Sequence, residues 1–295
     1  MKKILKEHAV LLADARKWFH KELVIKGVLS LSKDGVASNS DKDNTPSCAI
    51  GSLVAKSLGA KIQDRLPAQT AGKIFEELVC EFLQKTFPLL QHLRPGGWNI
   101  SNLGNNNSIK TSSFVQYEHL AHLAKVIMAD KQLATMLGND YVVAPDIVVS
   151  RKPCEDAAIN ASDVIVNDTV SLKADLRKSN NPLDIMHASV SAKWTMRSDR
   201  AQNSRTEALN LIRNRKGRVP HIVVVTGEPL PSRLSSLALG TGDIDCMYHF
   251  ALYELIYAVH EYGKDGREDV VELLDSMVAG NRLKDISDLP LDLCC

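Results

Sequence analysis

Apolar residues recur at helical spacing in several stretches of the chain, and each such stretch predicts an amphipathic helix. The clearest covers residues 71–87, where Ile74, Phe75, Leu78 and Phe82 form one apolar stripe. The same pattern predicts helices over 6–23, 49–59, 114–137, 246–262 and 267–278.

Three shorter stretches predict strands, at 141–149, 188–194 and 222–226. The last is a continuous apolar, β-branched run, which is typical of a strand covered on both faces. Stretches 38–46 and 94–113 are rich in turn residues and predict loops. Helices around a small sheet indicate an α/β fold. We therefore expect one large domain, residues 1–295, with a central mixed sheet and a polar insertion at 151–187.

Composition narrows the class of protein. The 295 residues are 44% hydrophobic and 24% charged, as in globular proteins. No apolar run is long enough to span a bilayer, and the first residues do not resemble a secretory signal, so we expect a cytoplasmic protein with no membrane partner. The six cysteines form no CxxC pair, which favours free thiols over a zinc site or disulfides.

An acid and a lysine in the predicted strands indicate phosphodiester chemistry. Asp146 follows Pro145 in an apolar stretch, where an ionised carboxylate needs a cation or hydrogen-bond partners. Alternation in 188–194 puts Ser191 and Lys193 on one face and Trp194 on the other. Carboxylates hold Mg²⁺, and a nearby ammonium stabilises phosphate charge. This arrangement is that of a metal-dependent nuclease of the PD-(D/E)xK type.

The second acid of that pattern is absent from its usual place, two residues before the lysine. Ser191 occupies the position, so another carboxylate must replace it. Glu207, on the helix expected after Lys193, and Glu76, on the 71–87 helix, are the candidates. The alternative is an Asp146–Lys193 ion pair that serves only the structure of an ordinary α/β sheet.

Positive charge is concentrated just after the lysine. Residues 193–218 hold eight basic and two acidic residues, a net charge of +6, in a chain whose total is +1. Within this segment Arg197 and Arg200 bracket Asp199. Arginine recognises guanine and aspartate accepts from cytosine in the major groove, so the segment is suited to reading G·C pairs. A solvated helix face is the alternative interpretation.

These residues resemble a known family. Ser191-Ala192-Lys193, followed by Arg197-Ser198-Asp199-Arg200 and then Glu207, is similar to the Type IIF restriction endonucleases that cut around a CCGG core. The resemblance runs from about residue 33 to 293. It includes segments 65–70, 94–96, 213–218, 220–226, 238–242 and 283–293.

The resemblance implies a restriction-endonuclease-like core and a Type II enzyme that cleaves double-stranded DNA with Mg²⁺. The implied site is GCCGGC, cut after the first G to leave 5′ overhangs. Asp146, Glu207 and Glu76 would hold the metal, Lys193 would assist attack, and Ser191 would complete the catalytic group. The implied assembly is a homotetramer holding two DNA duplexes, and the implied partner is a methyltransferase of the same system.

The resemblance also implies DNA contacts. The inner CCGG would be read by Arg197, Ser198, Asp199 and Arg200, the minor groove by Gln69, and the outer base pair by Asp41 and Arg233. In the 38–47 loop, Lys42 and Asp43 replace smaller residues of the family beside Asp41, so the loop can read the outer pair differently, and we expect Asp43 to contact DNA as well. Two other functions stay open: a catalytically silent DNA-binding protein on this fold, and a non-nuclease α/β enzyme with a structural ion pair.

Overall fold

The computed structural model describes residues 10–104, 111–129, 132, 135–136, 145–240, 242–264 and 266–295, except for the side chains of Met128 and Ser198. The strands are β1 (Trp98–Asn102), β2 (Ile147–Arg151), β3 (Ile185–Lys193), β4 (His221–Thr226), β5 (Cys246–His249) and β6 (Leu283–Asp285). The helices are α1 (Leu11–Ile25), α2 (Thr45–Ser57), α3 (Ala68–Thr86), η1 (Phe87–Leu90), η2 (Val115–Tyr117), α5 (His119–Ala129), α7 (Asp156–Ile159), α8 (Ser198–Asn214), α9 (Pro231–Ala238), α10 (Leu252–Gly263), α11 (Glu268–Ala279) and α12 (Leu289–Asp292).

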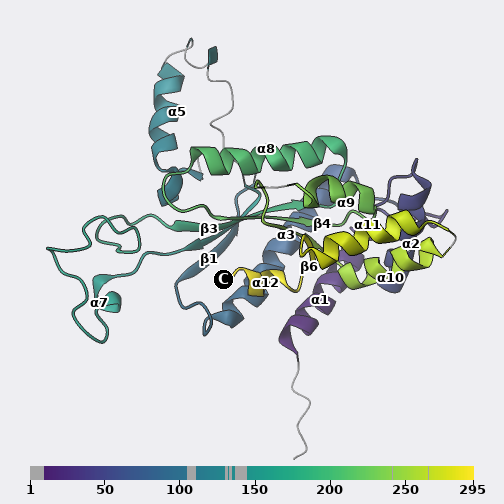
Figure 1. Ribbon diagram of the computed structural model, residues 1–295, viewed down its shortest axis with the longest axis horizontal. Helices are drawn as coiled ribbons and strands as arrows, with labels where there is room; N and C mark the ends of the chain where they lie inside the picture. The colour runs from purple at the N-terminus through teal and green to yellow at the C-terminus, as the bar shows by residue number, and fades with distance from the viewer. Residues whose placement is uncertain are drawn as a thin grey trace, which may run out of the picture.

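One six-stranded mixed sheet forms the centre, in the order β1-β2-β3-β4-β5-β6. The β1–β2 and β2–β3 pairs are antiparallel, whereas β3 to β6 run parallel. In Figure 1, α8 crosses one face of the sheet and α3 the opposite face. β4 is covered on both faces, as its apolar run predicts: five of its six residues are buried. The expected single α/β domain with a mixed sheet and flanking helices is confirmed.

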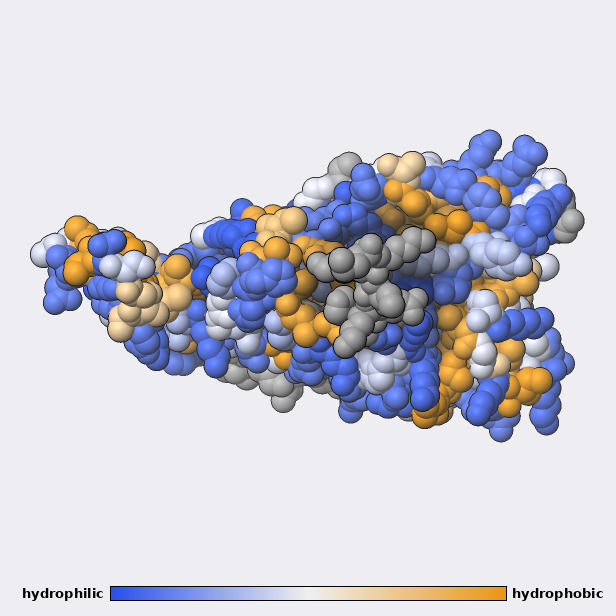
Figure 2. Space-filling view, turned by 90° about the horizontal axis from the view of Figure 1, so that it is seen from below, coloured by the Kyte–Doolittle hydropathy of each residue, from blue (hydrophilic) through white to orange (hydrophobic). Residues whose placement is uncertain are grey.

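The connection between β2 and β3 extends well beyond the sheet and carries α7 (Figure 1). Since β2 and β3 pair directly, residues 152–184 leave the sheet and return to it. Arg151 and residues 185–187, which we expected in the insertion, belong to the strands. Apolar side chains are exposed along this arm, at the narrow left end of Figure 2: Val164, Ile165, Val170, Leu172 and Leu176.

Two expected elements are wrong. The stretch 246–262 is not one helix, because Cys246–His249 form β5 and α10 begins only at Leu252. β5 lies between β4 and β6 and is buried throughout, and a short buried strand is as apolar as a buried helix turn. The stretch 94–113 is not all loop, since it contains β1. This edge strand is polar and only Ile100 is buried, so its pattern is weak.

Other boundaries moved. The described part of the 141–149 strand begins at Ile147, so Asp146 precedes β2 instead of lying within it; residues 141–144 lie outside the described residues. The 114–137 helix is η2 and α5 in its described part. The short elements α9, β6 and α12 were not predicted.

In the described residues no helix has the length and apolar character needed to cross a membrane. The six cysteines are free.

The core connects α3 to the end of β3. Trp194, directly after β3, is 3% exposed, and its ring lies 5.0 Å from Phe75 of α3 and 5.3 Å from Phe250. The expectation that Trp194 faces the core is confirmed. Because Phe75 and Trp194 are the sequence neighbours of Glu76 and Lys193, this packing holds the acid and the lysine in a defined relation.

Phe75→Ala should therefore lower the free energy of unfolding by about 3–5 kcal/mol, because it leaves a cavity under Trp194. Urea unfolding followed by circular dichroism would measure this. The control is Leu89→Ala, where the side chain is 45% exposed and the expected loss is below about 1 kcal/mol. Equal losses in the two variants would contradict the packing argument.

Candidate active site

The pairing of β2 with β3 positions Asp146. Ile147 lies opposite Val190 in the antiparallel ladder, which brings the residue before β2 to the last residues of β3. The carbonyl of Asp146 also accepts from the backbone N–H of Leu103 at 3.0 Å, which attaches it to the end of β1. The carboxylate is thus positioned by backbone contacts to two neighbouring segments.

The Asp146 carboxylate accepts three hydrogen bonds from consecutive residues of β3. Its Oδ2 lies 2.8 Å from Lys193 Nζ, 3.1 Å from the Ala192 backbone N and 3.3 Å from Ser191 Oγ. The side chains of Asp146 and Lys193 are only 15% and 19% exposed. The sequence expectation of a partner for Asp146 in this environment is met by a charge-assisted hydrogen bond.

Glu207 reaches the same place from α8. Burial is the largest cause that raises the pKa of its carboxyl, to about 7, and Asp146 adds to the effect. Lys193 and a hydrogen bond with Ser191 act in the opposite direction. The Ser191 hydroxyl therefore stands between Asp146 and Glu207, where it can donate its single proton to either.

Glu76 approaches from α3, on the opposite face of the sheet from α8. Burial raises the pKa of its carboxyl, and the Asp146 charge raises it further, while a hydrogen bond with the Asn102 side chain opposes this. Asn102 was not among the residues expected at the site. It is the last residue of the polar strand β1, and only the pairing of that strand with β2 brings it to the site.

Lys193 stays charged in this environment. Burial alone would lower the pKa of its ammonium, but the attraction of Asp146 and Glu207 outweighs it, and the pKa is raised. One ammonium thus faces three carboxylates, two of which have raised pKa values. A further positive charge at this site would therefore favour the ionised form of the carboxyls.

The donor atoms are suited to a hard divalent cation. Carboxylate, hydroxyl and amide oxygens from Asp146, Glu207, Glu76, Ser191 and Asn102 are the ligand types that Mg²⁺ prefers. Within the described residues, however, no three histidine, cysteine or acidic side chains converge closely enough to form a ready metal site. The chemistry of the donors fits the ion, and Lys193 forms an ion pair with Asp146.

A cleft of about 390 Å³ opens beside these groups. Its walls include Gln69 and Glu76 of α3, Asn102 of β1, Lys193 of β3 and Arg200 of α8. Gln69, expected to reach the minor groove, therefore lines the same cleft as the catalytic candidates.

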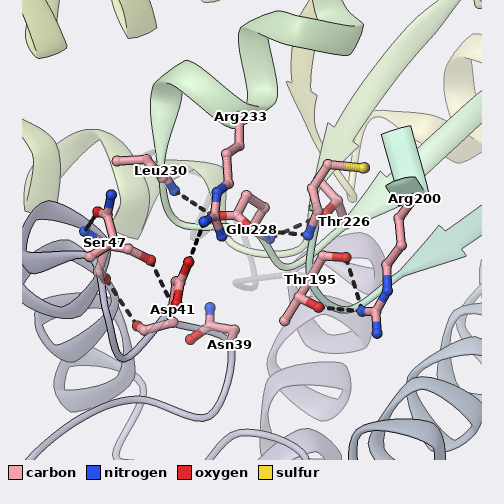
Figure 3. Close-up of polar contacts among 12 residues, drawn as sticks. Asn39, Asp41, Ser47, Thr195, Arg200, Thr226, Glu228, Leu230 and Arg233 are labelled. Atoms are coloured by element: carbon pink, nitrogen blue, oxygen red, sulfur yellow. Dashed lines mark hydrogen bonds and ion pairs between the residues drawn. The ribbon is translucent and has the colours of Figure 1, made fainter. Parts of the chain in front are cut away.

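The predicted base-reading segment lies at the start of α8. Arg197 occupies the position before the helix, and Asp199 and Arg200 lie in its first turn. The Arg200 guanidinium donates to both the carbonyl and the hydroxyl of Thr195, as Figure 3 shows. Ser198 begins the helix, but its side chain lies outside the described part of the chain.

The residues predicted to contact the outer base pair form a second group. Arg233 of α9 donates to the Asp41 carboxylate (Figure 3). This bond lowers the pKa of Asp41, as does a backbone N–H from Asp43, 3.3 Å from Asp41 Oδ1. The two groups adjoin: the charge of Arg197 also acts on Asp41.

Sequence analysis missed Arg65 and Glu228. Burial, followed by repulsion from Arg197, lowers the pKa of the Arg65 guanidinium, so three arginines, Arg65, Arg197 and Arg200, crowd one surface. Arginines that crowd one surface in this way suit a phosphate backbone. Glu228 is fully buried beside Arg233. Its signal in the sequence is an acid two residues after the end of the apolar β4.

The similarity of this chain to known proteins identifies its family. Residues 19–295 match the family model described as NgoMIV restriction enzyme. The chain belongs to this family. It is 49% identical over 284 residues to the Type II restriction enzyme NgoMIV of Neisseria gonorrhoeae, covering 96% of this chain and 98% of that protein. This NgoMIV-family chain is therefore a Type II restriction endonuclease, a site-specific deoxyribonuclease, and the resemblance seen in its sequence is confirmed.

A solved structure, the restriction endonuclease PspGI–substrate DNA complex, aligns over 99% of this chain and 96% of that one. Its sequence identity is 11% and its TM-score 0.25.

The raised pKa of Glu207 makes a prediction about stability. A carboxyl titrating near 7 in the folded state and near 4.5 when unfolded stabilises the fold only at low pH, and that stability is lost as the pH rises through 7. Glu207→Gln removes the free-energy cost of ionising this buried carboxyl at high pH. In EDTA at pH 8 it should raise the free energy of unfolding by on the order of 2 kcal/mol, with the gain vanishing near pH 4.5.

Urea unfolding at the two pH values measures this difference. Glu77→Gln, next to the site on α3 but 50% exposed, is the control and should change little. A Glu207→Gln variant that is no more stable than the wild type at pH 8 would contradict the electrostatic account of the site.

Proposed function

We propose that this enzyme uses Mg²⁺ to cut both strands of DNA at a palindrome with a CCGG core. The expected site is GCCGGC, cut after the first G to leave 5′ overhangs. The observation that carries the proposal is the Asp146–Lys193 ion pair beside the cleft, with Glu207 and Glu76 within electrostatic range. It combines oxygen ligands for a metal with a cation for phosphate.

In this proposal Asp146, Glu207 and Glu76 hold Mg²⁺, which supplies an activated water and offsets phosphate charge. Lys193 keeps its proton, so it acts as a hydrogen-bond donor and not as a base. It is suited to orienting the attacking water or to stabilising the phosphate. Ser191 aligns two of the carboxylates through its hydroxyl. Glu207 thereby compensates for the acid that Ser191 replaces.

Recognition would use the two groups of readers. Arg197, Ser198, Asp199 and Arg200 read the inner CCGG in the major groove, and Gln69 contacts the minor groove. Asp41, Asp43 and Arg233 contact the outer base pair. Support comes from the family resemblance and from the way Arg65, Arg197 and Arg200 concentrate positive charge next to the cleft.

The proposed assembly is a homotetramer that binds two duplexes. The exposed apolar side chains of the 152–184 arm support an assembly, because soluble monomers rarely expose many together. A DNA methyltransferase of the same system would protect the host site without forming a stable complex. The proposed location is the cytoplasm, where the host genome lies.

The second candidate is a catalytically silent DNA-binding protein on the same fold. The absence of an acid at Ser191 motivates it. The burial of Glu207 beside Ser191 argues against it, because a buried carboxylate with a raised pKa is costly to keep without a use.

Digestion of a fully sequenced, unmethylated plasmid separates the two candidates. We expect discrete cuts at GCCGGC with Mg²⁺ and none with EDTA, and the mapped ends give the flanking bases and the cut position. Lys193→Ala should abolish cleavage and retain DNA binding, whereas the control Lys85→Ala, on the exposed part of α3, should cut normally. An active Lys193→Ala enzyme would refute the role of the lysine. A wild type that binds GCCGGC without cutting would favour the silent protein.

Arg197→Lys tests base readout, because lysine keeps the charge and loses the two-pronged contact to guanine. Binding to the specific site should weaken by about 10–100-fold, corresponding to roughly 1–3 kcal/mol, with non-specific affinity nearly unchanged. Competition binding in Ca²⁺ measures both affinities. Arg213→Lys, near the far end of α8, is the control. Equal loss on specific and non-specific DNA would mean that Arg197 contacts phosphate only.

A further inference from the structure

A fully buried carboxylate lies between the two groups of proposed DNA readers. Glu228 follows β4 and is 0% exposed. An ionised side chain with no access to water is stable only if hydrogen bonds and a cation compensate for the lost solvation. The partners of Glu228 therefore indicate what the residue positions.

Those partners come from both groups. Glu228 Oε2 accepts from the backbone N–H of Met196 at 2.9 Å, immediately before Arg197 and α8. Its Oε1 accepts from the backbone N–H of Leu230 at 3.2 Å, immediately before α9. Arg233 Nη1 lies 3.8 Å from Oε2, and the same guanidinium donates to Asp41. Figure 3 shows Glu228 and Asp41 on either side of the Arg233 head group.

The backbone beside Glu228 is held just as closely. A Cβ at Gly227 would come within 2.4 Å of the Trp194 ring, so only glycine permits this approach of β4 to the residues after Lys193. The Gly227 carbonyl accepts from Asn39 Nδ2 at 2.6 Å, which attaches the 38–44 loop to the same turn. The turn thus contacts the loop that carries Asp41 and the segment that leads to Arg197.

From these contacts we infer that Glu228 is a positioning residue for sequence specificity. It joins the segment Arg197–Arg200, which is proposed to read the inner bases, to the Asp41–Arg233 ion pair, which is proposed to contact the outer base pair. The inference rests on the proposed function, since it assigns a role to residues that the proposal makes DNA readers. Loss of the Glu228 charge would release the Met196 backbone and Arg233 together. Discrimination at inner and outer base pairs would then fall in parallel.

The carboxylate also makes specificity dependent on pH. Burial raises the pKa of Glu228 to about 7, against the opposing backbone bond from Met196 and the charge of Arg233. The other titratable groups that face it are Asp41, whose pKa is lowered, and His249 of β5, whose buried ring has a pKa of about 4. Asp41 stays ionised and His249 stays neutral between pH 6 and 8. Among these neighbouring groups, therefore, only Glu228 titrates in that range.

The test compares discrimination ratios of full-length wild type and Glu228→Gln, which preserves shape and removes charge. Three short DNA duplexes are compared. One carries the cognate site GCCGGC, one has its outer base pair exchanged, and one has a single core base pair exchanged. The dissociation constants are measured in Ca²⁺ and kcat/KM in Mg²⁺. At pH 8 we expect both ratios, cognate to outer-exchanged and cognate to core-exchanged, to fall at least tenfold in the variant. From pH 8 to 6 the wild-type ratios should approach those of Glu228→Gln, whose own ratios stay flat.

Glu254→Gln is the matched control. It removes a partly buried acid that is also paired with an arginine, Arg16 at 2.6 Å, on α10 away from the readers. It should lower stability without changing either ratio. Because Glu207 acts on every duplex alike, its titration cancels in the ratios.

Unchanged ratios in Glu228→Gln would overturn the inference, and so would a loss confined to the outer pair. If that variant does not fold, the wild-type profile decides: ratios that stay flat from pH 8 to 6 overturn it. Failure of the proposed function is visible separately, as a wild type that does not distinguish the three duplexes at pH 8.

Discussion

The cost of burying carboxylates around a single ammonium governs the proposed active site of this enzyme. Asp146 is neutralised by Lys193, but Glu207 and Glu76 share the same poorly solvated space and resist ionisation. The site is stable because α3, β3 and α8 are held from outside, by the packing of Phe75 on Trp194 among other contacts. A fold that holds acids together against their mutual repulsion favours the binding of cations. A nuclease can use this to bind Mg²⁺, which offsets the negative charge of the phosphate.

The proposed recognition surface follows the same principle with the opposite sign. Arg65, Arg197 and Arg200 crowd the start of α8. Arg200 donates to Thr195, and Arg233 of α9 contacts Asp41 and Glu228. These internal bonds hold long side chains in place before DNA arrives, which reduces the entropy that binding must overcome. The proposed catalytic lysine, Lys193, and the first proposed base reader, Arg197, lie four residues apart, where β3 ends and α8 begins.

Much of the fold was predictable where one physical signal dominated. The apolar stripe of α3 and the β-branched run of β4 each admit one interpretation, and the structure agrees. Prediction failed where two structures share a pattern: Cys246–His249 is as apolar as a helix turn, and the polar edge strand Trp98–Asn102 resembles a loop. Both strands are defined by their neighbours in the sheet, which the local pattern does not contain.

The sequence by itself determined the chemistry: an acid beside an apolar strand, a lysine and serine on one strand face, a basic segment after them, and enough family pattern to identify a restriction endonuclease. Only the tertiary structure decided which groups act together. The register of β2 on β3 brings Asp146 to Lys193. The packing of α3 and α8 on opposite faces of the sheet brings Glu76 and Glu207 within electrostatic range of the same lysine. The contacts of Asn102 and Glu228 are seen only in the folded structure, because the partners of a side chain depend on burial and on the distance between segments far apart in the chain.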